Sequence, residues 1–370
     1  MAKAKQTQEL SAEHGGSSED QIASFLKNNE EFHYNNVQQE DYSVSSGSLK
    51  MDIEMGGGIH PGIVRFSGIT EGGKTSCALA FARSFQNNVP NSKVIYIKAE
   101  GRLSDEIIDR AGINTKENKW FVFKCNIYET AVQLINELIH NNPTNKKYFF
   151  IIDSMDALNL KEDMNRVFGT ANKVAGSAYL SADFLKKMAL PLSSLGHMCI
   201  MISQIRTAVS INPYEKKDPR VTNASGGNAM LHYSDWILEF QTRYRSDLIT
   251  SLPDSKGDIL GHFCKVIFRK SPNEKTYKEV TYPIKYGRIG GTSVWAEYEI
   301  VDLMIMFEMV NVKASWITTG EEIRKELKKE GFELPEKIQG LDNFRKLLEL
   351  NPKLTDYLYK KFEKALKKGQ

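Results

Sequence analysis

Short apolar runs recur along the chain from about residue 44, and each has the length and the β-branched or aromatic content of a buried strand. We expect strands at Ile63–Phe66, Val94–Ala99, Tyr148–Asp153, Met198–Ser203, Trp236–Gln241, His262–Lys270 and Thr281–Tyr286. The earlier runs alternate with helical stretches, which is typical of parallel crossover units with helices on both faces of a sheet. Little helix separates the last runs, so we expect them to extend the sheet in antiparallel fashion. The pattern predicts an α/β fold with a central, mostly parallel sheet.

Two further segments flank this predicted core of residues 44–295. Residues 1–43 begin with a polar tail rich in Gly, Ser, Lys and Glu, and continue through a short amphipathic helix, expected over residues 20–29, into an arm. Beyond residue 296 the pattern turns helical and strongly charged, with Lys and Glu interspersed. We expect a small C-terminal domain over residues 296–370 that is either helical or α/β.

Composition and charge exclude several classes of protein. The formal net charge of the 370 residues is only +3, so any DNA-binding surface must be local. The four cysteines are isolated in apolar surroundings, which indicates structural thiols in a reducing cytosol. No secretory signal precedes residue 20, and no apolar run approaches membrane-spanning length. We therefore expect a cytoplasmic protein with no membrane partner.

A complete phosphate-binding loop follows the first predicted strand. It consists of Gly68, Ile69, Thr70, Glu71, Gly72, Gly73, Lys74 and Thr75, and Ser76 continues it into a helical pattern. The glycines allow backbone N–H groups to turn inward around phosphate oxygens, and the helix start adds its positive dipole end. We expect Lys74 to reach the β- and γ-phosphates and the Thr75 hydroxyl to hold Mg²⁺. The alternative is a glycine-rich surface turn, which leaves the apolar flanks unexplained.

Polar residues end three other predicted strands. Asp153 either holds Mg²⁺, usually through water, or caps the next helix. Many ATPases place a water-activating Glu directly after this Asp, but here Ser154 follows Asp153, so a catalytic base must come from elsewhere. Glu100 is the candidate that could polarise the attacking water. The amide of Gln204 can donate to a γ-phosphate and report nucleotide state to residues 205–225. The alternatives are a solvated strand-end charge for Glu100 and a satisfied structural amide for Gln204.

Two long connections, residues 159–176 and 205–227, follow strand ends on the nucleotide side. Both contain Gly, Asn and basic residues without clear periodicity. Long irregular loops in a compact domain are usually functional or disordered. Gly226 and Gly227 close the second connection and start a helix, which exposes backbone N–H groups to a phosphate. The alternative is a helix-leading turn without a ligand.

Together these residues resemble the bacterial RecA recombinase family, and most closely its phage, UvsX-type branch. The resemblance runs from about Ser43 to Tyr286. The matching segments are Ser45–Ile53, Gly68–Thr75, Ala99–Glu100, Asp153–Ser154, Gln204–Arg206 and Gly226–Ala229. The resemblance implies a RecA-type phosphate-loop ATPase core with ATP and Mg²⁺ as cofactors and Glu100 as the catalytic carboxylate.

The same resemblance implies a function in homologous recombination. The protein would form helical filaments on single-stranded DNA, pair it with homologous double-stranded DNA, and hydrolyse ATP when stimulated by DNA. The subunits would be joined by heterologous contacts, to which the N-terminal arm adds a strand or a helix. The implied DNA-binding residues are Arg166, Lys186, Arg206, Gly226, Gly227 and Asn228. Single-strand-binding and mediator proteins are further candidate partners, and a phage-encoded protein would act in the cytoplasm of its bacterial host.

The chain departs from the family pattern around the nucleotide. Ser104 and Ile107 stand where the family has an aromatic residue and an Asp that hold adenine, which leaves base selectivity open. The family also uses two basic residues, one apart, to reach the ATP of the neighbouring subunit. Here Lys270 matches one of them, but the other position is Pro272, so Arg269 is the candidate replacement.

Two other functions compete with recombination. One is a hexameric motor built on the same core, such as a helicase or a branch-migration ATPase. The other is a regulatory or clock-type ATPase with no role on DNA. The Gly226–Ala229 segment and the absence of a zinc module argue against the motor, and the length and glycines of the two loops argue against the regulator.

Overall fold

The computed structural model describes residues 18–38, 42–101, 103–165, 174–205, 227–252 and 256–368. The chain forms two units, residues 1–40 and 41–370. The first contains helix α1 (Ser18–Asn28), which begins two residues before the predicted start, and a 3₁₀ turn at Glu30–Phe32. Ile22, Phe25 and Phe32 are exposed within this unit, so their apolar side chains contribute to no core there.

A nine-stranded sheet forms the centre of the second unit, in the order β3-β2-β4-β5-β1-β6-β8-β7, with β9 paired to β8. The strands are β1 (Gly62–Gly68), β2 (Ser92–Lys98), β3 (Trp120–Lys124), β4 (Lys147–Asp153), β5 (Met198–Ile202), β6 (Trp236–Phe240), β7 (Leu248–Leu252), β8 (Lys256–Lys270) and β9 (Glu279–Lys285). All pairings from β3 to β6 are parallel, and those of β7, β8 and β9 are antiparallel. The predicted α/β fold and its antiparallel extension are confirmed.

Strands β3 and β7 were not predicted. Each is a short edge strand whose side chains are half-buried or exposed. An edge strand needs no continuous apolar run, because only part of its surface leaves water.

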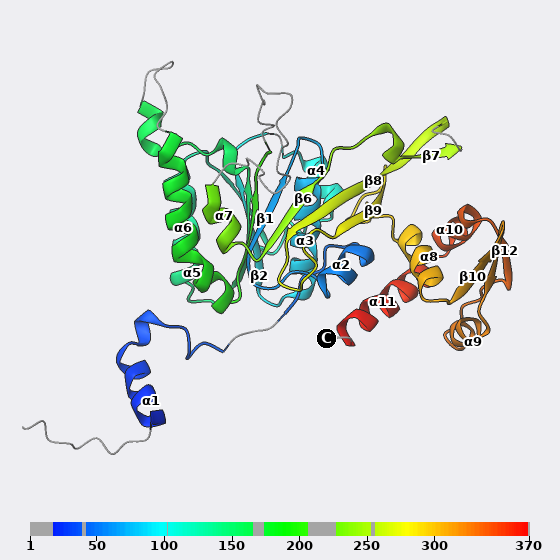
Figure 1. The fold of residues 1–370 in the computed structure, drawn as a ribbon, viewed down its shortest axis with the longest axis horizontal. Helices are drawn as coiled ribbons and strands as arrows, with labels where there is room; N and C mark the ends of the chain where they lie inside the picture. The colour runs from blue at the N-terminus through cyan, green and yellow to red at the C-terminus, as the bar shows by residue number, and fades with distance from the viewer. Residues whose placement is uncertain are drawn as a thin grey trace, which may run out of the picture. The chain divides into compact units, whose positions relative to one another are not determined.

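Helices cover both faces of the sheet (Figure 1). They are α2 (Leu49–Met55), α3 (Lys74–Asn88), α4 (Asp105–Ala111), α5 (Tyr128–His140), α6 (Val174–Ser194) and α7 (Gly227–Tyr233), with 3₁₀ turns at Met155–Ala157, Lys161–Asn165 and Arg245–Asp247. Alternate residues of β4 enter the two cores: Phe149 and Ile151 pack with α3, and Phe150 and Ile152 pack with α5 and α6. No helix in the described part of the chain is long and apolar enough to cross a membrane.

The C-terminal part of the chain is α/β, one of the two predicted alternatives. It contains α8 (Ala296–Met306), β10 (Val310–Lys313), β11 (Trp316–Thr319), α9 (Glu321–Lys329), β12 (Lys337–Gln339), α10 (Leu341–Leu350) and α11 (Pro352–Lys368). The three strands form an antiparallel sheet, and a third hydrophobic cluster lies among these elements. Leu49 and Ile53 of α2 join this cluster, while Met51 and Met55 of the same helix join the core beside α3.

A buried carboxylate joins α8 to the start of α2. Glu299 is 0 % exposed and accepts hydrogen bonds from the Ser48 hydroxyl at 2.5 Å and the Leu49 N–H at 2.8 Å. Ser48 also caps α2 by accepting a bond from the Met51 N–H. Burial raises the pKa of Glu299 to about 7, although the bonds from Ser48 and Leu49 favour the ionised form.

This raised pKa predicts a pH-dependent contribution to stability. The ordinary pKa of 4.5 lies below the folded value of about 7, so the folded chain binds more protons and the contribution of Glu299 falls as pH rises between the two. Glu299→Gln keeps partners for both bonds without a charge. The free energy of unfolding of Glu299→Gln should therefore increase relative to that of the parent as pH rises from about 5 to about 8. Urea unfolding at both pH values measures the difference, with Glu322→Gln on α9 as the exposed control. A gap that does not change with pH would contradict the assignment.

Candidate nucleotide-binding site

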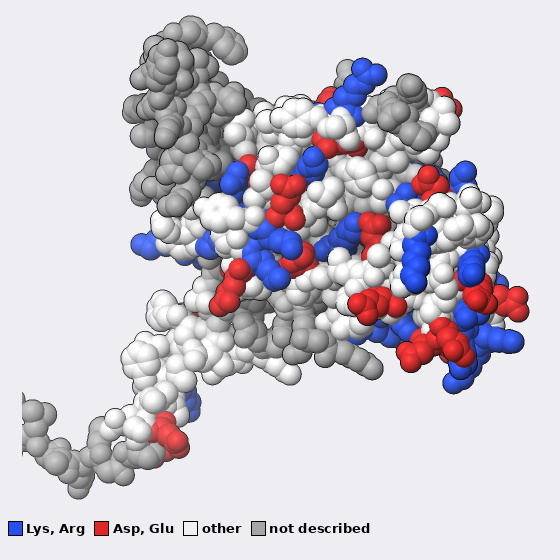
Figure 2. Space-filling view, turned by 45° about the vertical axis from the view of Figure 1, so that its right-hand side comes forward, with Lys and Arg blue, Asp and Glu red and all other residues white. Residues whose placement is uncertain are grey.

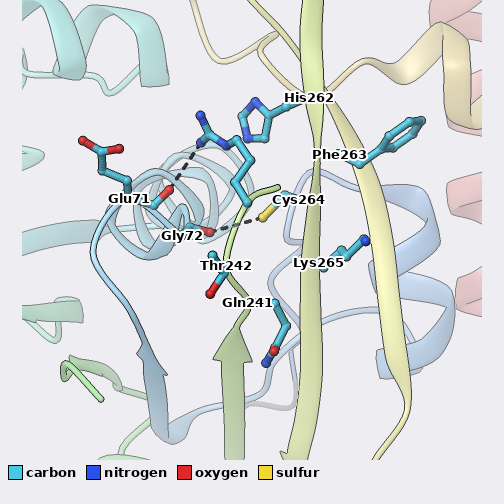
Figure 3. Close-up of a pocket in the computed structure, with 9 residues that line it drawn as sticks. Glu71, Gly72, Gln241, Thr242, His262, Phe263, Cys264 and Lys265 are labelled. Atoms are coloured by element: carbon cyan, nitrogen blue, oxygen red, sulfur yellow. Dashed lines mark hydrogen bonds between the residues drawn. The ribbon is translucent and has the colours of Figure 1, made fainter. Parts of the chain in front are cut away.

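The phosphate loop, Gly68–Thr75, connects β1 to α3 and rests against β6 and β8. Gly68 has φ +142°, and a Cβ there would lie 2.4 Å from the carbonyl oxygen of Phe240. Gly73 has φ +98°, and its Cβ would lie 3.3 Å from Cys264 Sγ. In Figure 3 Cys264 lies beside Gly72 of the loop, and its thiol donates to the Gly72 carbonyl at 3.5 Å. Close backbone approach therefore requires glycine at Gly68, and the positive φ favours glycine at Gly73.

The Lys74 ammonium lies within this loop. It is 8 % exposed and donates to the carbonyl oxygens of Gly68 at 2.9 Å and Ile69 at 2.5 Å. Burial lowers the pKa of Lys74, and the carboxylates of Asp153, Asp156 and Glu100 oppose that shift. A buried cation held within the phosphate loop suits the terminal phosphates of a nucleotide.

The Asp153 carboxylate ends β4 beside the start of α3. Its Oδ2 accepts hydrogen bonds from the Thr75 hydroxyl at 2.7 Å and from the Tyr96 hydroxyl at 2.5 Å. Ser154, joined to Asp153 by a cis peptide bond, is 1 % exposed, and its hydroxyl has no partner among the described residues. The side-chain oxygen atoms of Thr75, Asp153 and Ser154 are hard ligands that fit Mg²⁺.

The residues that the structure describes contain no cluster of three or more His, Cys, Asp and Glu residues able to hold a metal alone. Mg²⁺ commonly binds through one or two protein oxygens together with substrate phosphates. The donor set of Thr75, Asp153 and Ser154 fits that mode.

Glu100 and Gln204 meet at the same edge of the sheet. Gln204 Nε2 donates to Glu100 Oε1 at 3.1 Å, although the two residues follow β2 and β5 and β4 lies between these strands. The backbone N–H groups of Ala99 and Glu100 donate to the Asp153 carbonyl at 3.0 and 3.3 Å. Because Glu100 is exposed, water can reach its carboxylate.

Two charged residues at this edge were missed by sequence reasoning. Asp156 accepts a bond of 2.6 Å from the Gln204 backbone N–H. Arg65 is 2 % exposed and donates to the Ser203 hydroxyl at 3.1 Å. Burial lowers the pKa of Arg65, and the negative charge of Asp156 opposes that shift. An arginine inside the otherwise apolar β1 was the available sequence signal, since a buried charge requires a partner.

The predicted DNA-binding residues are only partly described. Lys186 is exposed on α6, beside Lys187, which pairs with Asp183 at 2.7 Å. Gly227 and Asn228 begin α7, while Arg166, Arg206 and Gly226 lie outside the described residues. On the face shown in Figure 2, Lys and Arg side chains alternate with Asp and Glu, so the charge on that face is mixed.

The two residues that depart from the adenine pattern have structural partners. The Ser104 side chain caps α4 by accepting from the Ile107 N–H at 3.4 Å. The Ile107 side chain packs against the hydrophobic core. Neither presents a ring or a carboxylate to a base.

Arg269 and Lys270 differ in how firmly they are held. Arg269 donates two bonds, of 2.8 and 2.7 Å, to Glu239, which is 6 % exposed. Lys270 donates to the carbonyls of Leu231 at 3.0 Å and His232 at 2.9 Å, near the end of α7. Moving Arg269 would deprive a buried carboxylate of its ion partner, so Lys270 is the residue more easily redirected.

A glycine loop between a parallel strand and a helix, with a buried lysine and a strand-end carboxylate beside it, defines a phosphate-loop nucleotide-binding protein. The RecA N-terminal domain family matches residues 27–290. The chain belongs to the RecA family.

Similar proteins include Protein RecA of Porphyromonas gingivalis, which is 27 % identical over 313 residues, covering 81 % of this chain and 84 % of the relative. Protein RecA of Rickettsia bellii is 26 % identical over 320 residues, covering 86 % of this chain and 82 % of the relative. Protein RecA of Rickettsia prowazekii is also 26 % identical over 320 residues, covering 86 % and 83 %.

Substitutions at Lys74 and Glu100 should separate nucleotide binding from hydrolysis. Lys74→Ala removes the cation from the loop, so both should be lost. Glu100→Gln keeps an acceptor for the Gln204 amide but no carboxylate to polarise water, so ATP should bind while turnover falls roughly 10²–10⁴-fold. Fluorescent ATP binding and phosphate release measure the two effects, with Glu137→Gln on α5 as the exposed control. Parent-like turnover in Glu100→Gln would remove Glu100 from this role.

Proposed function

We propose that this protein is an ATP-dependent DNA strand-exchange recombinase, which forms helical filaments on single-stranded DNA and pairs it with homologous duplex DNA. Proteins of the RecA family are DNA-dependent ATPases. The observation that carries the proposal is the 3.1 Å contact between Gln204 and Glu100. This contact links Glu100, the candidate base, to Gln204, which directly precedes the second long connection. A link of this kind is needed in an ATPase whose hydrolysis responds to DNA bound by that connection.

The chain's own residues account for the steps of hydrolysis. The loop amides and Lys74 would hold the β- and γ-phosphates, while Thr75 would bind Mg²⁺ directly and Asp153 through water. Mg²⁺, when bound, neutralises phosphate charge. Glu100 would orient and polarise the attacking water. The Gln204 amide would donate to the γ-phosphate and so report nucleotide state to the loop that follows it.

Coupling to DNA would pass through the backbone of Gln204. If its side chain leaves Glu100 for a γ-phosphate, the change begins at a residue whose N–H is held by Asp156 at 2.6 Å. Movement of the Gln204 side chain would alter this hydrogen bond to Asp156, and the change in the Gln204 backbone would continue into residues 205–227. The loop would then take up its DNA-binding form only with ATP present.

A filament follows if each ATP lies between one subunit's phosphate loop and the next subunit. Such a heterologous contact generates an open helix. We assign the cross-subunit contact to Lys270 in preference to Arg269, since Arg269 is paired with buried Glu239. Residues 1–43 would form the polymerisation arm, residues 44–295 the ATPase core and residues 296–370 the C-terminal domain. The exposed apolar side chains of α1 would pack on a neighbouring subunit.

DNA would be held by local contacts, because the net charge is small. Arg166, Lys186 and Arg206 would meet backbone phosphates, and the amides of Gly226–Asn228 would add neutral donors. The sequence pattern favours the phage UvsX-type branch, and with it the cytoplasm of a bacterial host. Single-strand-binding and mediator proteins would assist loading.

The competing function is that of a hexameric motor on the same core. Electron micrographs with single-stranded DNA and a non-hydrolysable ATP analogue discriminate the two. Filaments support the recombinase, and closed rings support the motor.

Loss of the Gln204 amide should uncouple DNA from hydrolysis. In Gln204→Ala the phosphate loop and Glu100 remain, so basal ATP hydrolysis should persist, while stimulation by single-stranded DNA should vanish. Phosphate release with and without DNA measures both, with Gln133→Ala on α5 as a matched control. Undiminished stimulation would show that coupling runs through other residues.

Salt dependence should reveal the phosphate contacts. Each lost basic contact flattens the slope of log affinity against log salt by about one unit per site. We expect this for Lys186→Ala and Arg206→Ala, assayed on single-stranded DNA with a non-hydrolysable ATP analogue. Lys187→Ala, one residue along α6 and paired with Asp183, is the matched control for Lys186→Ala and should keep the parent slope. Parent-like slopes in both test variants would refute these assignments.

A further inference from the structure

The carboxylate that ends β4 is fixed by two hydroxyl groups on one oxygen. Asp153 Oδ2 accepts from Thr75 Oγ1 at 2.7 Å and from the Tyr96 hydroxyl at 2.5 Å. The other oxygen, Oδ1, accepts neither bond. Thr75 belongs to the phosphate loop, whereas Tyr96 lies inside β2 and has no place in the loop's sequence pattern.

The sheet dictates where the Tyr96 hydroxyl lies. Alternate residues of β2 face opposite ways, so Val94 and Tyr96 enter the core beside α3, as does Ile151 of β4. In the parallel register Tyr96 is opposite Ile151, two residues before Asp153. The ring packs on Trp120 with centroids 5.7 Å apart, and the residue is 2 % exposed. Held at this point, the side chain extends to the strand end with its hydroxyl against the carboxylate.

The hydroxyl is a permanent donor. A tyrosine phenol is neutral at neutral pH, and an ionised carboxylate can only accept, so the Tyr96 hydroxyl is the donor of the 2.5 Å bond to Asp153 Oδ2. A neutral phenol beside a carboxylate donates a charge-assisted bond, which is about twice as strong as a neutral one. Such a bond restricts rotation of the carboxylate.

We propose that Tyr96 is a positioning residue of the Mg²⁺–ATP site, acting through Asp153. This assignment rests on the proposed function. Tyr96 and Thr75 both donate to Oδ2, so Asp153 would be held with Oδ1 available when Mg²⁺ binds. Thr75 keeps lone pairs on its own oxygen while its proton is donated to Asp153, so the hydroxyl orients the carboxylate and can still be a ligand. The Tyr96 hydroxyl donates to the carboxylate itself, so Tyr96 would act by holding the carboxylate still.

The competing explanation is that the bond merely satisfies a buried phenol. The two explanations differ in what the loss of the hydroxyl changes. A structural role alters stability, whereas a positioning role alters the concentration of Mg²⁺ that the site requires.

The test is a Mg²⁺ titration of Tyr96→Phe, which keeps the ring against Trp120. Binding of a fluorescent, non-hydrolysable ATP analogue is followed as Mg²⁺ is added. We expect half-saturation to need about 10-fold more Mg²⁺, at the lower end of the range for groups that orient a metal ligand, because the Thr75 bond remains. Analogue binding in excess chelator should match the parent, and in ATPase assays the KM for Mg²⁺ should rise by a larger factor than kcat falls.

Tyr128→Phe is the matched control. Tyr128 on α5 is also 2 % exposed, and its hydroxyl bonds to Ser181 in the core on the other face of the sheet. Its loss should lower the melting temperature without moving the Mg²⁺ titration. Equal Mg²⁺ half-saturation in Tyr96→Phe and Tyr128→Phe would overturn the assignment.

A double-mutant cycle tests the route through Asp153. In an Asp153→Ala background, adding Tyr96→Phe should shift Mg²⁺ half-saturation no further. An equal additional shift would place the effect of Tyr96 elsewhere and overturn the assignment. A parent protein that binds the analogue equally with and without Mg²⁺ would overturn the proposed function as well. Mg²⁺-dependent binding in the parent with no shift in Tyr96→Phe would overturn this assignment alone.

Discussion

Parallel pairing of four neighbouring strands is the constraint on which the site depends. Because β2, β4, β5 and β1 run in one direction, the ends that carry Glu100, Asp153, Gln204 and the phosphate loop meet at one edge. Burial of both faces fixes the register. A slip of one residue in β4 would exchange its side chains between the two cores and turn the Asp153 carboxylate away from Thr75.

The elements with strong local signals were predictable from the sequence. The phosphate loop is contiguous, and the central strands are continuous apolar runs that end in polar residues, so their type and direction could be inferred. The edge strands β3 and β7 were missed because half-exposed side chains leave no such run. An α/β C-terminal domain was one of the two predicted alternatives, but its strands β10–β12 were not located, because they span only three or four residues each within a region dominated by charged helical patterns.

Side-chain pairings across strands could not be predicted, since they depend on register and direction rather than on residue type. The sequence indicated Asp153 and Gln204, but not that Tyr96 would bond to the first and Asp156 to the second. It matched Lys270 to one basic position of the family and offered Arg269 as the replacement at the other. The structure separates them through Glu239, a charged residue in a buried strand whose only sequence signal was its apolar surroundings. The positions beyond Ile205 and before Gly227, where coupling to DNA is proposed, stay predictions.

Helix α2 belongs to two hydrophobic clusters at once. Leu49 faces the C-terminal elements, while Met51 and Met55 face the ATPase core, and Glu299 holds the start of the helix from α8. Neither side can therefore lose its packing without disturbing this shared helix. The C-terminal elements and the core are consequently expected to melt in a single cooperative transition, although their secondary structures are separate along the chain. The seven residues of α2 thus make the unfolding of the ATPase core and of the C-terminal elements a shared event.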